Sequence, residues 1–276
     1  MIEILLSVVF GVIVGLSLGL TGGGGSIFTV PLLIYGIGLA PLQAVPVSLV
    51  AVSLTSLIGA VQTFRERLLA WQPAVVFSLG GMIGAPLGVL WARCLDEIWI
   101  ITGFAILAIT VGVYMWRRAI VDPAATHVVR AYVHGADEGP VCRLTPEGEF
   151  RFGTPCAIIL STAGIGTGIL SGLFGVGGGF LIVPMLVMIT RMGIHRAVAT
   201  SLVIISVVGL TGAVTSLLHG DVMWGTLLPF VSGGAAGMIS GRYLAARIAG
   251  DTLQEIFAGI IVLLGIGMLV HAFSIE

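Results

Sequence analysis

The sequence predicts an all-α polytopic membrane protein built from two inverted-topology repeats, each with a glycine-broken short helix pair and three full spans. Three observations lead to this fold class. Hydrophobic residues make up 57% of the 276-residue chain and charged residues only 9%, a composition that excludes an ordinary soluble domain. The second half repeats the first at a fixed offset. The arginines of the two halves lie at opposite ends of matching segments, which is what inversion requires.

The first half contains five apolar segments of unequal length. The first two, residues 3–20 and 27–37, fall short of the roughly 20 apolar residues that a span needs. We expect them to enter and return on one side as a hairpin, or to cross as short tilted pieces. Three full spans are expected to follow at residues 42–64, 73–92 and 98–116.

The second half follows the same pattern after a polar interruption. We therefore divide the chain into a first transmembrane repeat (1–117), a soluble linker (118–152) with a small strand pair near residues 141–152, and a second repeat (153–276). The apolar segments of the second repeat are residues 157–173, 180–190, 198–218, 225–248 and 253–273.

The repeat is clearest in one glycine-rich stretch. Residues 19–33 read GLTGGGGSIFTVPLL, and residues 172–186 read GLFGVGGGFLIVPML, 153 positions later. The same register continues without a gap, which indicates an internal duplication. It pairs Pro31 with Pro184, Ser48 with Ser201, Gly59 with Gly212, Trp71 with Trp224, and Gly80, Gly84 and Gly88 with Gly233, Gly237 and Gly241.

Consecutive glycines predict a break in each membrane helix, because each costs about 0.8 to 1 kcal/mol relative to alanine in a helix. Irregular backbone at membrane depth survives only when it is buried in protein or lines a polar cavity. Matching breaks in two halves point to a transporter's binding site. The alternative is that these glycines only permit close helix packing.

Exposed amides and helix N-termini favour an anion, so we expect helices beginning near Ser26 and Gly179 to point at a shared small-anion site. Polar side chains of the third segment and its copy are further candidates, although serine and threonine often bond back to their own helix. The predicted substrate-binding residues are Thr21, Gly22, Gly23, Gly24, Gly25, Ser26, Ser48, Gln62, Gly175, Gly177, Gly178, Gly179, Ser201 and Thr215.

The sequence lacks the residues that several other functions require. No Asp or Glu lies in the middle of an apolar segment, which disfavours a cation substrate or a proton relay. The glycine run has no P-loop lysine, and the chain contains no catalytic motif, so we expect neither an enzyme nor a cofactor. The three cysteines lack metal-ligand or CxxC spacing, and we expect no metal site and no pairing among them.

The arginines also predict the orientation, because basic residues near span ends concentrate on the cytoplasmic side. With each glycine hairpin returning to its own face, every arginine except Arg93 lies on the linker side. The linker should be cytoplasmic and both termini outside. Arg242 is the deepest charge; it either meets an anion or snorkels to the nearby face.

The paired glycine stretches, each followed by VPLL or VPML and then by AVPVS or AVATS, resemble the sulfite exporter TauE/SafE family. The resemblance covers both repeats and implies a permease of the bacterial inner membrane. Its substrates would be sulfite, sulfoacetate or another organosulfonate. We expect alternating access, with a passive small-anion channel as the alternative. The expected partners are the lipid bilayer and the anion, with no nucleic acid; a homo-oligomer is compatible with the sequence.

Overall fold

The computed structural model describes residues 2–64, 69–121, 143–144, 150–151, 153–190, 192–219, 223–245 and 259–270. Within these ranges the chain is almost entirely helical, and six helices are long and apolar enough to cross a membrane. The expectation of an all-α polytopic membrane protein is therefore confirmed. The six helices cover Glu3–Thr21, Pro41–Phe64, Trp71–Ala92, Glu97–Tyr114, Thr154–Phe174 and His195–Leu218.

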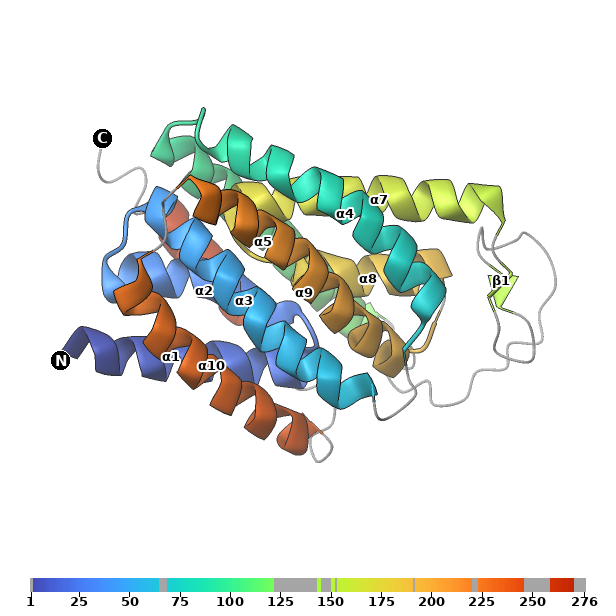
Figure 1. The fold of residues 1–276 in the computed structure, drawn as a ribbon, viewed down its shortest axis with the longest axis horizontal. Helices are drawn as coiled ribbons and strands as arrows, with labels where there is room; N and C mark the ends of the chain where they lie inside the picture. Colours follow the sequence, from blue (N-terminus) through green and yellow to red (C-terminus); the bar gives the residue numbers. More distant parts are fainter. Residues whose placement is uncertain are drawn as a thin grey trace.

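The first half consists of a broken helix pair and three long helices (Figure 1). Three short elements with different helical geometries follow one another and form a single apolar helix over Gly24–Ile37. The elements in order are α1 (Ile2–Thr21), the 3-10 helix η1 (Gly24–Phe28), α2 (Thr29–Pro31), the π-helix η2 (Leu32–Ile37), α3 (Pro41–Phe64), α4 (Trp71–Ala92) and α5 (Glu97–Val121).

The second half repeats this order. Its elements are α7 (Thr154–Phe174), α8 (Gly179–Thr190), α9 (Ile194–Leu218), α10 (Trp224–Ala245) and the helix Gly259–Val270. The expected last segment, residues 253–273, lies partly outside the described residues. In the linker, strand β1 (Arg143–Leu144) pairs antiparallel with β2 (Phe150–Arg151), which confirms the expected strand pair. Helix α5 covers the first four residues of the expected linker, 118–121.

Each half packs its first helix against the other half. Helix α1 lies along α10 and α7 lies along α4, while α3 and α9 pair with each other (Figure 1). Helix α1 starts at the left of Figure 1, and α7 starts at the right, next to β1. At the 153-residue offset, α1 corresponds to α7 and α10 to α4, so the two large helix contacts are copies of each other.

Glycines form the seams of both copies. A Cβ atom at any of the seam glycines of α4 would overlap a backbone carbonyl of α7, and the same holds for α10 against α1. Small residues allow helix backbones this close approach in membranes. Gly80, Gly84 and Gly88 meet Ser161, Ile165 and Ile169, while Gly233, Gly237 and Gly241 meet Val8, Val12 and Leu16, each partner again 153 positions from its copy.

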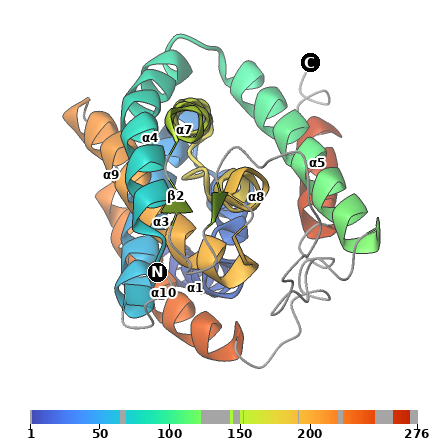
Figure 2. The same ribbon diagram turned by 90° about the vertical axis from the view of Figure 1, so that its right-hand side faces the viewer.

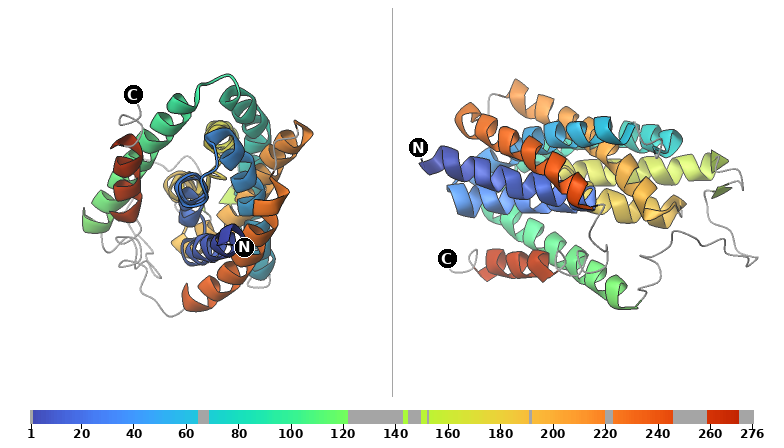
Figure 3. Two further views of the ribbon diagram at one scale, coloured as in Figure 1. Left: turned by 90° about the vertical axis from the view of Figure 1, so that its left-hand side faces the viewer. Right: turned by 90° about the horizontal axis from the view of Figure 1, so that it is seen from below.

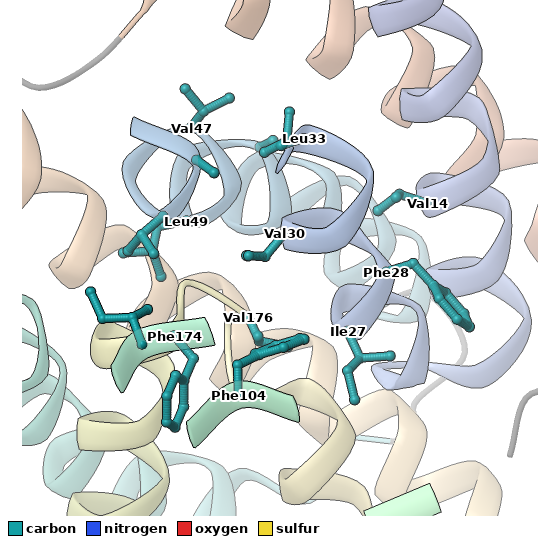
Figure 4. Packing of buried hydrophobic residues seen from close by; sticks show 14 of the residues in the cluster. Val14, Ile27, Phe28, Val30, Leu33, Val47, Leu49, Phe104, Phe174 and Val176 are labelled. Atoms are coloured by element: carbon teal, nitrogen blue, oxygen red, sulfur yellow. The ribbon is translucent and has the colours of Figure 1, made fainter. Parts of the chain in front are cut away.

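The short helices lie in the interior of the bundle. Figure 2 shows α7 and α8 between α4 and α9 on one side and α5 on the other. Figure 3 (left) shows the short first-half helices, in blue, in a similar central place from the opposite end. Their apolar side chains form the main core with α3 and α5 (Figure 4). There Phe104 of α5 meets Phe174 at the end of α7 edge to face, with ring centroids 6.0 Å apart.

Two cysteines among the described residues differ in state. Cys156, near the start of α7, is buried and disulfide-bonded, whereas Cys94, which follows α4, is free and exposed. The expectation that no cysteine is paired is therefore wrong for Cys156. Spacing along the chain reports local cysteine motifs and does not detect a pairing that folding creates.

Candidate functional site

The first helix break lies directly after α1. Gly22 adopts a left-handed conformation, with φ of +72°, and its N–H donates to the carbonyl of Leu18 at 2.7 Å, which ends the helix. The chain then reverses, and the 3-10 helix begins at Gly24, two residues before the expected start at Ser26. In this first turn the hydroxyl of Thr21 accepts the N–H of Gly25 at 3.2 Å.

The second break separates α7 from α8. Gly175 ends α7 with φ of +71°, and Gly177 and Gly178 both have φ of +67°. Left-handed backbone costs a residue with a side chain about 1–2 kcal/mol, so glycine is favoured at these positions. Helix α8 begins at Gly179, as the sequence predicts.

The two breaks touch each other. A Cβ atom at Gly23 would lie 2.5 Å from the carbonyl oxygen of Gly179, and one at Gly179 would lie 2.8 Å from the carbonyl oxygen of Gly23. All the glycines of both breaks are buried. The structure therefore brings Gly23 and Gly179 together inside the protein, with no side chain between their two backbones.

Two serines hold the breaks across the repeat boundary. The hydroxyl of Ser201 donates to the carbonyl of Gly22 at 2.7 Å, and the hydroxyl of Ser48 donates to the carbonyl of Gly175. Both serines are fully buried. These bonds are again copies at the 153-residue offset. Both hydroxyl protons are directed at protein carbonyls, so in this arrangement the serines position the breaks.

The remaining predicted side chains fall into two groups. Thr21 and Ser26 bond within the first break, through the carbonyls of Ser17 and Gly23, each at 2.8 Å. The hydroxyl of Thr215 donates to the carbonyl of Thr211 in its own helix at 2.9 Å. This is the back-bonding that serine and threonine often make in helices.

Gln62 lies away from its predicted neighbour Ser48. It is fourteen residues further along α3, or about 21 Å. It lies one turn beyond Gly59, whose Cβ position faces Met238 of α10 and Leu202 of α9. The side-chain oxygen of Gln62 is buried and has no hydrogen-bond partner among the described residues. Ser48 and Gln62, which share one face of α3 by helical periodicity and were both predicted to bind the substrate, thus lie at two different levels of the helix.

Several donors around the breaks are buried and unpaired. Among the described residues, no hydrogen bond uses the backbone amides of Gly24, Gly177 or Gly178. The hydroxyl of Ser171, four residues before Gly175, is also without a partner, and Ser171 is only 1% exposed. A Cβ atom at Gly178 would lie 3.4 Å from the Cβ of Ser171. Buried unpaired donors are rare in proteins, which favours a water molecule or ligand here.

Ser171 and Thr29 were missed by the sequence reading. Thr29, in α2, is fully buried, and its hydroxyl has no partner among the described residues. Their repeat positions hold Leu18 and Ile182, so a search for matched polar pairs overlooks both. The available signal was a hydroxyl one turn from a glycine break in an apolar segment.

The donors that the breaks present are uncharged backbone amides and hydroxyl groups. No group of three or more His, Cys, Asp or Glu residues suited to a metal ion occurs in the described part of the chain. The positive end of a helix points at each break from η1 and from α8. Neutral donors at two helix N-termini suit a small solute that accepts hydrogen bonds and carries negative charge.

Comparison with known proteins places both repeats in one family. The family model described as sulfite exporter TauE/SafE matches residues 7–268. A probable membrane transporter protein of Xylella fastidiosa (strain Temecula1) is 34% identical over 262 residues, 93% of this chain and 91% of the relative. The probable membrane transporter protein YunE of Bacillus subtilis (strain 168) is 25% identical over 268 residues, 94% of each chain. No solved structure gives a significant match. The chain therefore belongs to the sulfite exporter TauE/SafE family and is a multi-pass membrane transporter.

Proposed function

We propose that this protein is a secondary transporter, and specifically an exporter, of a small sulfur-containing oxyanion such as sulfite, sulfoacetate or another organosulfonate. The carrying observation is the contact between the two glycine breaks, with unpaired buried donors at Gly24, Gly177, Gly178 and Ser171. The family description supplies the sulfur chemistry. The substrate site lies at this contact, where backbone amides and the Ser171 hydroxyl hold the anion.

The transport mechanism we propose is alternating access by two inverted repeats. Reciprocal contacts between the two repeats support it. Helix α1 packs on α10 as α7 packs on α4, and a serine of each repeat donates a hydrogen bond to the glycine break of the other repeat. Rocking one repeat against the other would open the buried contact alternately to each side. The glycine seams let the helices of the two repeats approach each other at backbone distance.

We further propose that the linker is cytoplasmic and that both termini face outward. Arg117 at the end of α5, Arg196 at the start of α9 and Arg242 near the end of α10 all belong to the linker end, whereas Arg93 follows α4 at the other end. The disulfide at Cys156 argues the opposite way, since disulfides are typical of oxidising compartments. The arginines outweigh it because both repeats carry arginine at the linker end, at positions that do not correspond in the duplication.

The proposal is tested with purified protein in liposomes, by following uptake of radiolabelled sulfite. Uptake should saturate and should be accelerated by unlabelled sulfite inside the vesicles. Gly177→Leu places a side chain on Val52 and should abolish uptake while the protein still inserts. Gly166→Leu, on the open side of α7, is the matched control and should transport normally.

Two results would contradict the proposal. Normal uptake by Gly177→Leu would remove the glycine contact from the transport path. A flux that grows linearly with concentration and shows no counterflow would favour the alternative, a passive small-anion channel. Sulfate, thiosulfate, sulfoacetate and taurine as competitors identify the preferred anion.

A further inference from the structure

The donors of the two glycine breaks are not equivalent. The amide of Gly178 has no hydrogen-bond partner among the described residues, whereas the amide of its counterpart, Gly25, donates to the hydroxyl of Thr21 at 3.2 Å. The buried hydroxyl of Ser171 is also unpaired, and the Cβ of Ser171 lies 3.4 Å from the Cβ position of Gly178. With the unpaired amide of Gly177, the second break therefore gathers a group of donors that the first break does not repeat in the described part of the chain.

Two branched apolar side chains, one from each repeat, close the second break on the side of α3 and α9. A Cβ atom at Gly177 would lie 2.6 Å from a methyl carbon of Val52 and 3.4 Å from one of Ile205, and a Cβ atom at Gly179 would lie 2.6 Å from Ile205. Both side chains are fully buried in one apolar cluster, and we name this pair the apolar wall. Val52 and Ile205 are counterparts at the 153-residue offset, so the duplication supplies the wall from both halves.

At the contact between the breaks, the first repeat presents an acceptor. A Cβ atom at Gly179 would lie 2.8 Å from the carbonyl oxygen of Gly23, which accepts the amide and the hydroxyl of Ser26 at 3.2 and 2.8 Å. A carbonyl oxygen does not donate a hydrogen bond, so it cannot hold an oxygen of an anion. An oxyanion at the second break therefore has donors toward α7, which carries Ser171, and methyl groups toward α3 and α9.

We infer that Val52 and Ile205 are specificity-determining residues of the transporter, which select pyramidal oxyanions over tetrahedral ones. This inference rests on the proposed function and adds the apolar wall to the same substrate site. A pyramidal anion, such as sulfite or a sulfonate, carries its three oxygens on one face of the sulfur. Its other face carries a lone pair or a carbon substituent, which needs no hydrogen bond and packs against methyl groups.

Sulfate does not fit the same arrangement. Its fourth oxygen points away from the other three, toward the apolar wall, where the methyl groups of Val52 and Ile205 offer no donor. An anion oxygen that is buried without a donor loses its hydration and receives no hydrogen bond in exchange. We therefore expect sulfate to bind at least about tenfold more weakly than a sulfonate of similar size.

The test measures how two competitors inhibit the uptake of labelled sulfite into proteoliposomes. For the wild-type protein, the inhibition constant of sulfate should be at least about tenfold higher than that of methanesulfonate, which has one bare face. Val52→Asn places N–H donors in the wall and should reduce this ratio to about twofold or less, and so should the counterpart substitution Ile205→Asn. Val61→Asn, on an exposed position of α3, is the matched control and should leave the ratio unchanged.

Val52→Ala separates hydrogen bonding from size. It enlarges the site without adding a donor, so the ratio should keep its wild-type value; a lower ratio would mean that the wall excludes sulfate by bulk, which overturns the inference. Equal inhibition of the wild-type protein by sulfate and methanesulfonate, or an unchanged ratio in both Asn variants, also overturns it and leaves the transport proposal intact. If neither Asn variant inserts, the ratios of the wild-type protein and of Val52→Ala decide. Wild-type protein that moves no sulfite overturns both proposals.

Discussion

Gly177 provides the sharpest test of how the second break is built. Its left-handed backbone, with φ of +67°, costs an alanine about 1–2 kcal/mol. Its new Cβ atom would also lie 2.6 Å from a methyl carbon of Val52 on α3, an overlap of the kind that costs about 1–3 kcal/mol. Gly177→Ala should therefore destabilise the protein by about 2–5 kcal/mol, the sum of these two effects.

Gly178 separates these two effects. Its φ is the same, but the nearest atom to an added Cβ is 3.3 Å away, so Gly178→Ala should carry mainly the backbone cost, about 1–2 kcal/mol. The additional Val52→Ala substitution should recover the overlap part of the Gly177→Ala loss. A double-mutant cycle on these two positions should thus show a favourable coupling.

The measurement is the free energy of unfolding in mixed micelles, with the initial rate of sulfite uptake recorded for the same variants. Gly177→Ala should transport much more slowly than Gly178→Ala, since only the former pushes α3 away from the break. Equal stability of the two single variants, or no coupling between positions 177 and 52, would refute this account of the packing.

Three further outcomes follow from the same structure. Ser48→Ala and Ser201→Ala should each lower the free energy of unfolding by about 0.5–1.5 kcal/mol, because each removes one inter-repeat hydrogen bond; a loss confined to one of them would contradict the reciprocal arrangement. Gly84→Val should prevent a monodisperse peak in size-exclusion chromatography, because its side chain would overlap the α7 backbone, whereas Gly166→Val, which faces open space, should elute normally. Cys94, free and exposed at the end opposite the linker, should react with a membrane-impermeant maleimide in intact cells; labelling only after lysis would reverse the proposed orientation.

The sequence was sufficient where structure is decided locally. Consecutive glycines predict where α7 must end and α8 begin, because the backbone preference belongs to the residues themselves. The first short helix begins two residues before the expected Ser26, because Gly24 and Gly25 adopt the 3-10 geometry that a run of glycines does not predict. The hydrophobic character of the membrane-spanning helices likewise follows from composition alone.

The contacts that individual side chains make were not predictable from the sequence in the same way. Ser48 was expected to line the site, but its hydroxyl is directed at Gly175, which is 127 residues away in the chain. That contact exists only after the two repeats have packed together. Ser171 was missed because its counterpart is Leu18, and duplication guided the choice of candidates. Gln62 was grouped with Ser48 by helical periodicity, which reports a shared face and not a shared depth.

The pairing of α1 with α10 has a consequence for biosynthesis. Helix α1 ends at Thr21 and its partner α10 begins only at Trp224, so α1 is made long before α10. The N-terminal helix must wait in the bilayer with its glycine face uncovered until the last part of the chain arrives. Neither half can mature alone, yet two separately encoded halves, produced in one cell, should find each other and rebuild the complete carrier.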